Sequence, residues 1–272
     1  MERTKINWAD STFNPWQGCT KVSDGCDNCY AKRQDARKLH GDKETHWGTG
    51  AARKLLSEAN WLKPLAWNRK AGREGTRPRV FCASMADWAD KEAPEGQRDR
   101  LWETIQHTPN LDWLLLTKRA PNIRKYLPAG WGKTGYANCW LGVSVENRKK
   151  GVPRIDKLRK VPASVRFLSV EPLLEDLGPL DLSGIHWVII GGETGPGARS
   201  MDTGWVRSIL SQCKDQGVPA WLKQLGRSPT HAGKELVLAD AEGKRSSKGE
   251  DFDIWPNGLG RLKVRQLPIT NA

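Results

Sequence analysis

No apolar run in this 272-residue chain approaches the ~20 residues that a membrane-spanning helix needs. Its first residues, MERTKINWADST, contain no apolar segment of the kind that a secretory signal requires. The usual sequence signals for membrane insertion and for secretion are therefore both missing. We expect a cytoplasmic protein that has no membrane partner.

Acidic residues are few, because 31 Asp and Glu stand against 44 Lys and Arg and leave a net charge of +13. The excess is concentrated in residues 31–79, with 13 basic and 5 acidic side chains, and in residues 118–166, with 13 and 2. A solvated basic surface without a specific partner would have the same composition. Together with 14 tryptophans, which can stack on bases, the two segments favour DNA or a nucleotide as partner.

Only six cysteines are present, and Cys19, Cys26 and Cys29 follow the spacing C-x6-C-x2-C. Cytosolic cysteines are more often metal ligands or free thiols than disulfides, and sulfur ligands select zinc, Cu(I) or iron–sulfur clusters. Structural zinc usually takes four protein ligands, and no second C-x2-C or H-x3-H follows. The set of three therefore indicates a [4Fe–4S] cluster with one open iron. We expect the scattered Cys82, Cys139 and Cys213 to be core residues.

Short apolar runs alternate with segments of helical composition along the chain. Strands are predicted near residues 13–17, 79–84, 112–117, 139–145, 165–170, 186–191 and 219–224, and helices at 31–39, 51–67, 95–106, 152–158 and 204–216. The last helix has Trp205, Ile209 and Cys213 at helical spacing, with Asp202 or Thr203 as its N-cap and Gly217 after its end. About seven strands in this alternation predict an α/β fold with a partial or full (β/α) TIM-like barrel.

The composition changes after residue 226 to Gly, Lys, Ser and Asp. We therefore divide the chain into a barrel domain, residues 1–226, and a peripheral C-terminal extension, residues 227–272. A short hairpin is predicted near residues 255–267 of the extension.

Polar residues follow five successive predicted strands, and three of these strands end on or next to a glutamate. Turn residues end strands in every protein, so one such end carries no information. Five in succession favour a site at the carboxyl ends of the strands, where barrels place their active sites. The segments concerned are 84–87, 117–119, 144–147, 169–172 and 191–193.

Five motifs together resemble a known group. They are CTKVSDGCDNCYA (residues 19–31, preceded by WADSTFNPWQG), LLLTKR (114–119), LGVSVEN (141–147), FLSVEPLL (167–174) and WVIIGGETGPGAR (187–199). The chain up to Gly226 resembles the three-cysteine family of phage and bacterial proteins related to radical S-adenosylmethionine (SAM) enzymes, and more distantly spore photoproduct lyase. It departs from ordinary radical SAM enzymes in the cysteine spacing, which is usually C-x3-C-x2-C.

The resemblance implies a barrel of the radical SAM type, a [4Fe–4S] cluster on Cys19, Cys26 and Cys29, and SAM bound at its open iron. Tyr30 would lie near the adenine. From what SAM requires, Ser144 and Glu146 are candidates for the ribose hydroxyls. Ser84 and Asp87 are candidates for the sulfonium and amino group. Lys118 and Glu171 are the candidate catalytic residues, from their positions after strands. The Gly-Gly-Glu of residues 191–193 follows the sixth strand rather than the second, so no role is assigned to it.

The sequence thus predicts a radical SAM-type enzyme, an isomerase, a lyase or another class, that abstracts hydrogen from a DNA base or nucleotide. Hypermodification of phage DNA or a repair-like rearrangement would be such reactions, in the host cytoplasm if a phage encodes the protein. An external electron donor such as flavodoxin or ferredoxin would be needed. The alternative is a non-catalytic nucleic-acid-binding protein in which the three cysteines, with His40 or His46, form a zinc or iron–sulfur knuckle.

Overall fold

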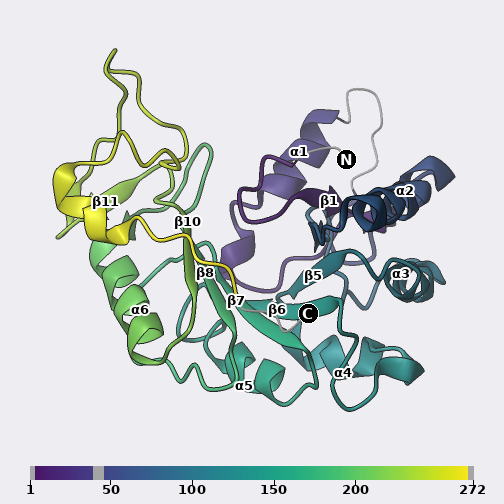
Figure 1. The fold of residues 1–272 in the computed structure, drawn as a ribbon. Helices are drawn as coiled ribbons and strands as arrows, with labels where there is room; N and C mark the ends of the chain where they lie inside the picture. Colours follow the sequence, from purple (N-terminus) through teal and green to yellow (C-terminus); the bar gives the residue numbers. More distant parts are fainter. Residues whose placement is uncertain (1–3, 39–45, 269–272) are drawn as a thin grey trace. The chain divides into compact units, whose positions relative to one another are not determined.

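The computed structural model describes residues 4–38 and 46–268 and places seven strands in one sheet (Figure 1). The order of the strands in the sheet, β1-β4-β5-β6-β7-β8-β10, is also their order along the chain. The pairs β1–β4, β4–β5, β7–β8 and β8–β10 are parallel. The strands are β1 (Ser11–Phe13), β4 (Arg79–Cys82), β5 (Asp112–Thr117), β6 (Cys139–Ser144), β7 (Val165–Val170), β8 (Trp187–Gly191) and β10 (Ala220–Gln224).

Helices lie in most of the connections between these strands. They are α1 (Tyr30–Lys38), α2 (Glu58–Glu74), α3 (Gln97–Gln106), α4 (Ile123–Tyr126), α5 (Pro153–Arg159) and α6 (Thr203–Asp215). Parallel strands in chain order with helical crossovers are the arrangement of a (β/α) barrel. Among the described residues, β1 and β10 are the two edge strands of this sheet and do not pair with each other, so the barrel is not closed. The fold is therefore α/β with a partial TIM-like barrel sheet, as the sequence predicts.

Strands β6 and β8 are buried at every residue. Strands of a parallel sheet that are covered on both faces read as continuous apolar runs, which is why the sequence reveals them. The predicted core positions Cys82, Cys139 and Cys213 are buried, as are Trp113, Trp140 and Trp187. Trp221 on β10 is only partly buried and packs edge-on against Trp187, with ring centroids 6.2 Å apart.

The predicted helix at residues 51–67 is displaced in the structure. Residues of that range form β3 (Lys54–Leu55), which pairs antiparallel with β2 (Trp16–Gln17), and α2 begins only at Glu58. It then continues past Trp67 to Glu74, where Gly75 at φ +61° ends it. Strand β3 is only two residues long and exposed, so it leaves no alternating pattern in the sequence.

Helix α6, Thr203–Asp215, begins and ends within one residue of the predicted range, 204–216. The Asp202 side chain accepts a hydrogen bond from the N–H of Gly204, and Gly217 follows the helix at φ +67°. Its buried residues include Val206 and Ile209, whereas Trp205 is only half-buried. Two of the three predicted apolar positions, Ile209 and Cys213, are therefore buried as predicted, and Val206 takes the place predicted for Trp205.

The C-terminal extension contains β11 (Pro229–His231) and β12 (Lys234–Glu235), which form a small sheet with β9 (Met201–Asp202). The hairpin predicted near residues 255–267 is wrong, because that segment contains the 3₁₀ helix η4 (Asn257–Leu262). The chain then pairs with β10: the N–H of Leu222 donates to the Val264 carbonyl at 2.7 Å. This pairing covers a sheet edge that would otherwise offer unpaired backbone groups. The division at residue 226 stays a prediction.

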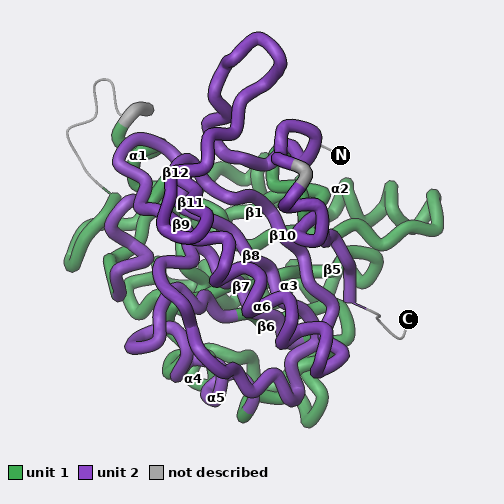
Figure 2. The backbone as a smooth tube through the Cα atoms, turned by 90° about the vertical axis from the view of Figure 1, so that its left-hand side faces the viewer, with its two compact units in different colours: residues 1–22, 29–142, 160–165 green, residues 23–28, 143–159, 166–272 purple. Residues whose placement is uncertain are grey.

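The chain forms two compact units (Figure 2). Unit 1 comprises residues 1–22, 29–142 and 160–165, and unit 2 comprises residues 23–28, 143–159 and 166–272. The boundary between them passes twice through the segment that carries the three cysteines. No helix in the described part of the chain is long and apolar enough to cross a membrane.

Candidate functional site

The cysteine loop, residues 18–29, begins directly after β2 and ends at the first turn of α1. Gly18 adopts φ +110°, and a side chain there would meet the carbonyl oxygen of His46 at 2.2 Å. Only glycine therefore lets the backbone turn into Cys19 at this point. At the other end, the Cys29 carbonyl accepts a hydrogen bond from the N–H of Arg33 at 3.2 Å. Both ends of the loop are thus fixed by local geometry.

The six cysteines fall into two groups. All are free, but the three loop cysteines are partly exposed whereas Cys82, Cys139 and Cys213 are buried. Cys19 and Cys29 belong to unit 1, and Cys26 belongs to unit 2. No three His, Cys, Asp or Glu side chains among the described residues form a group that would hold a metal ion. The ligand set stays a prediction, and its chemistry, three thiols on one loop, suits an iron–sulfur cluster.

The zinc alternative relies on His40 or His46 as a fourth ligand. His40 lies outside the described residues. His46 lies within unit 1, where its Nδ1 is 3.0 Å from Oδ2 of the buried Asp35. This contact orients the imidazole ring of His46 and gives it a partner within the protein.

Arg119, the second residue after β5, holds the start of the cysteine loop in unit 1. Its Nη1 lies 3.3 Å from Cys19 Sγ and 2.8 Å from Asp87 Oδ2, and its Nη2 donates to the Thr20 carbonyl at 2.8 Å. Burial, with the Asp87 charge adding to it, raises the pKa of the Cys19 thiol to about 12, although the Arg119 charge opposes the rise. The Cys19 thiol therefore keeps its proton in the metal-free chain.

A second buried arginine, Arg53, braces the same part of unit 1. Its Nη2 lies 2.6 Å from Glu92 Oε2 and 2.7 Å from Thr20 Oγ1, and its Nε lies 3.0 Å from Asp90 Oδ2. Its Nη1 donates to three backbone carbonyls, of His46, Gly48 and Ala51. Buried charges are tolerated only when they are paired and fully hydrogen-bonded, and Arg53 meets this condition.

Two predicted SAM contacts are brought together in unit 1. The Tyr30 hydroxyl donates to the Ser84 carbonyl at 2.7 Å. Asn14 supports the same strand end, because its Nδ2 donates to Ser84 Oγ at 3.1 Å and its Oδ1 accepts from the Met85 N–H at 2.7 Å. Tyr30 is exposed, with 42% of its surface accessible.

Asp87 is buried and accepts hydrogen bonds on both carboxylate oxygens. Oδ1 accepts from Thr117 Oγ1 at 2.6 Å and from the Ala89 N–H at 3.0 Å. Oδ2 accepts from Arg119 and, at 3.2 Å, from the Lys118 N–H. Asp87 thus joins the segments that follow β4 and β5. Its predicted contact with SAM, and that of Lys118 with substrate, stay predictions.

In unit 2, Ser144 and Glu146 are both held by Arg154 of α5. Arg154 Nη1 donates to the Ser144 carbonyl at 2.8 Å and lies 2.6 Å from Glu146 Oε2. All three side chains are buried. The structure therefore brings the two predicted ribose ligands together through Arg154, a partner that the sequence analysis did not identify. Their contact with ribose stays a prediction.

The Gly-Gly-Glu segment after β8, to which no role was assigned, holds the middle of the cysteine loop. Glu193 Oε2 accepts from Asn28 Nδ2 at 2.8 Å, and Arg199 binds both oxygens of Glu193. Arg199 Nη2 also donates to the Asp24 carbonyl at 2.8 Å. Although burial opposes it, hydrogen bonding by Arg199 and Asn28 lowers the pKa of Glu193. The GGETGPGAR motif is therefore a clamp on residues 24–28.

The candidate catalytic residue Glu171 is also in unit 2, at the end of β7. Its Oε1 lies 2.5 Å from Lys223 Nζ and 2.9 Å from Gln224 Nε2. Adjacent strand residues normally point to opposite faces, but the β8–β10 pairing shifts register between Leu222 and Gln224. This bulge turns both side chains toward Glu171, which is a common use of bulges near functional sites.

A family model described as "Protein of unknown function (DUF5131)" matches residues 3–256. The chain belongs to this family. No curated protein matches it. Two solved structures of spore photoproduct lyase are similar: a double mutant with bound AdoMet and dinucleoside spore photoproduct, at TM-score 0.47 and 13% identity, and a single mutant with the dinucleoside spore photoproduct, at 0.45 and 12%.

The alignments cover 69% and 78% of this DUF5131 chain, but only 57% and 62% of the lyase chains. The chain thus spans less than two thirds of the length of either. A likeness at these scores and identities is too distant to establish a shared reaction.

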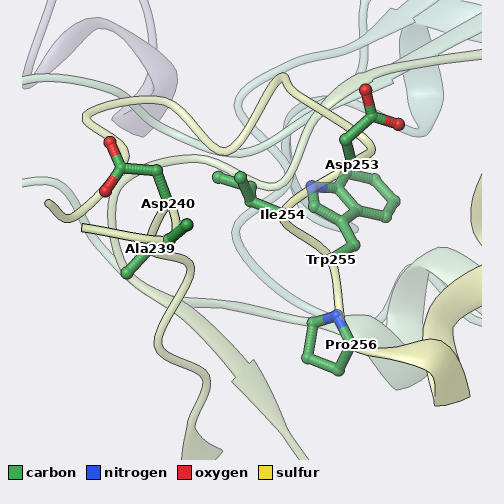
Figure 3. A pocket seen from close by; sticks show the side chains of 7 residues that line it. Ala239, Asp240, Asp253, Ile254, Trp255 and Pro256 are labelled. Carbon is green, nitrogen blue, oxygen red and sulfur yellow. The ribbon is translucent and has the colours of Figure 1, made fainter. Parts of the chain in front are cut away.

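This DUF5131 protein has a cavity that is lined by other residues than those of the predicted site. It has a volume of about 400 Å³, lies in the C-terminal extension and is lined by residues 239–241 and 253–256, including Asp240, Asp253 and Trp255 (Figure 3). None of the predicted site residues lines it. The candidate site is therefore described by the hydrogen-bond networks of its side chains, and this cavity is not part of it.

Proposed function

We propose that this DUF5131 protein is a radical SAM-type enzyme whose [4Fe–4S] cluster is bound by Cys19, Cys26 and Cys29. The contrast in burial among the six cysteines carries the proposal. Buried cysteines such as Cys82 fill space in the core, whereas Cys19, Cys26 and Cys29 are partly exposed, lie within eleven residues of one another and are not part of the core. Such thiols, on a loop braced by Arg53, Arg119 and Arg199, are explained by a ligand that binds sulfur.

The side chains around the loop would position SAM. When bound, a reduced cluster and SAM supply a 5′-deoxyadenosyl radical, which abstracts hydrogen from an unreactive C–H bond. We assign Tyr30 to the adenine, since its exposed side chain is held by the hydrogen bond to Ser84. Ser84 and Asp87 would serve the amino and sulfonium end, and Ser144 and Glu146 the ribose. Arg154 fixes the direction of the Glu146 carboxylate.

We infer a DNA base or a nucleotide as substrate, and an external electron donor such as flavodoxin or ferredoxin. The net charge of +13 supports a polyanionic partner. In the described part of the chain, Lys149 and Lys150 are exposed and have no ion-pair partner, so their charges are available to phosphates. Lys118 and Glu171 are the side chains that we assign to the substrate.

Anaerobic purification and reconstitution test the cluster. We expect brown protein with about four irons per chain. After reduction it should convert SAM to 5′-deoxyadenosine and methionine, slowly without substrate. Colourless protein with one zinc per chain would favour the nucleic-acid-binding knuckle instead. Iron-loaded, reduced protein that binds no SAM would end the radical SAM proposal.

The assignment of Glu171 is tested separately. Glu171→Gln keeps the shape of the side chain but removes the charge that faces Lys223. It should lower turnover of a substrate and leave the slow cleavage of SAM without substrate unchanged. The exposed Glu242→Gln is a matched control from the C-terminal extension and should change neither rate. Equal loss of both rates in Glu171→Gln would show that Glu171 acts on SAM or on the fold.

A further inference from the structure

Arg119 has a contact that its role as a partner of Asp87 does not require. Only 9% of its side chain is exposed, and Nη1 is shared between Asp87 Oδ2 at 2.8 Å and Cys19 Sγ at 3.3 Å. Nη2 is held by the Thr20 carbonyl, and the Arg119 N–H donates to Thr117 Oγ1 at 2.8 Å. Hydrogen bonds therefore hold both terminal nitrogens of the guanidinium and the backbone N–H of Arg119. One N–H of Nη1 is directed at the Cys19 sulfur.

The direction of this hydrogen bond is set by chemistry. A guanidinium has five N–H donors and no acceptor, so Arg119 can only donate to the sulfur. In the metal-free chain the Cys19 thiol can itself donate to the Thr20 carbonyl, 3.5 Å away. A metal-bound thiolate has no proton to give and becomes a stronger acceptor. The Arg119–Cys19 contact is thus the one of these two hydrogen bonds that persists, and gains strength, when Cys19 binds a metal.

We propose that Arg119 is a positioning residue that hydrogen-bonds Cys19 Sγ in the metal-bound protein and raises the reduction potential of the iron–sulfur site. Hydrogen bonds to cluster sulfurs, and positive charge beside them, favour the reduced state because it carries one more negative charge. The inference rests on the proposed function, since it requires a cluster on Cys19. It assigns a role to Arg119, to which the sequence analysis gave none from its position after the strand.

Arg53 is the natural control for this assignment. It is buried in the same network of unit 1 and also binds Thr20 and Asp90. All of its hydrogen bonds within the described part of the chain go to oxygen atoms. A general effect of weakening the network should therefore appear in both arginine variants, whereas an effect through sulfur should appear only at Arg119.

The experiment compares Arg119→Lys with Arg53→Lys in the reconstituted full chain. Both substitutions keep the positive charge and remove the fork of N–H groups. Iron content is counted first, and the midpoint potential of each protein is then measured by redox titration followed by electron paramagnetic resonance. Arg119→Lys should shift the potential to a more negative value, and Arg53→Lys should leave it unchanged. A tenfold change in the reduction equilibrium corresponds to about 59 mV for one electron.

The outcomes separate the inference from the proposed function. Wild-type protein that takes up no iron would end both. Wild-type protein with a cluster, and an Arg119→Lys variant with the same potential, would overturn the inference alone. If Arg119→Lys does not fold, selective labelling of the wild type with ¹⁵N-arginine decides the question. The reduced cluster should then show a magnetic coupling to arginine nitrogen, and its absence would overturn the inference.

Discussion

The Glu146 carboxylate and the Arg154 guanidinium form a bidentate ion pair inside unit 2. Arg154 Nη1 lies 2.6 Å from Glu146 Oε2, and Nη2 lies 3.2 Å from Oε1. The exposed fractions of the two side chains are 0% for Glu146 and 7% for Arg154. Arg154 thereby ties helix α5 to the end of β6 and to the residues that follow it, where the two predicted ribose ligands Ser144 and Glu146 lie.

Replacing Glu146 by Gln should destabilise the protein strongly. The substitution leaves the buried Arg154 without its charge partner, and breaking a buried pair in this way costs about 3–5 kcal/mol. Urea unfolding followed by circular dichroism measures this loss. The double variant Glu146→Gln, Arg154→Met removes both charges and should recover part of the stability. A single variant that unfolds like the wild type but no longer binds SAM would instead show that Glu146 acts mainly on the ligand.

The clamp formed by Glu193 should make stability depend on pH. Its pKa is lowered in the folded protein, where Arg199 and Asn28 bind the carboxylate. A lowered folded pKa stabilises the protein above the unfolded value of about 4.3, and this contribution is lost as pH falls from about 5 through the folded pKa.

The comparison of wild type with Glu193→Gln isolates this contribution. The difference in urea midpoint between the two proteins should be largest near neutral pH and should shrink below about pH 5. A difference that stays constant from neutral to acid would mean that Glu193 contributes through shape and neutral hydrogen bonds alone. Hydrogen exchange of the amides of residues 24–28 gives a local readout, and it should accelerate in the same variant.

Cys26→Ala should abolish cluster binding while most of the fold remains. Cys26 is partly exposed and lies on a loop, so the loss of its side chain leaves no cavity in the core. Circular dichroism should stay close to that of the wild type, with no iron bound after reconstitution. Cys213→Ala is the control: it removes a buried side chain of α6, so it should cost about 1 kcal/mol and leave the iron content unchanged. Global unfolding of Cys26→Ala would indicate a structural metal, whose binding energy is folding energy.

The strands of the sheet could be predicted from the sequence, but the side-chain contacts around the candidate site could not. Strands β5 and β7 have the bounds predicted for them, because strands covered on both faces are continuous apolar runs. By contrast, Lys118 and Arg119 follow the same strand, and only the folded chain shows that Arg119 meets Cys19, 100 residues away. The bulge that turns Lys223 and Gln224 to the same carboxylate has no signature in an alternating pattern.

The basic loop between β6 and α5 should bind nucleic acid through phosphates. Lys149 and Lys150 are exposed there, beside Arg148, whose Nη2 lies 3.4 Å from Asp176 Oδ2. Replacing both lysines by Glu should weaken binding to all sequences alike, since phosphate contacts carry no sequence information. The same exchange at the exposed Lys234 and Lys244 of the C-terminal extension is the matched control and should have little effect.

The salt dependence gives the sharper test of this last expectation. Release of counterions makes log affinity fall linearly with log salt, by about 0.9 per duplex phosphate contact and about 0.7 on a single strand. The slope of log affinity against log salt should therefore be flatter in the Lys149, Lys150 double variant than in the wild type. The difference should be about 0.9 on duplex DNA, or about 0.7 on a single strand, for each phosphate that the two lysines bind.

The form of the DNA should also matter. Chemistry on a base requires that the base leave the stack, so single-stranded or mismatched DNA should bind at least as well as intact duplex. Cleavage of SAM without substrate should be unchanged in the Lys149, Lys150 double variant. Fluorescence anisotropy that detects no binding, or binding insensitive to salt, would exclude nucleic-acid polymers and leave a free nucleotide or another small metabolite as the substrate.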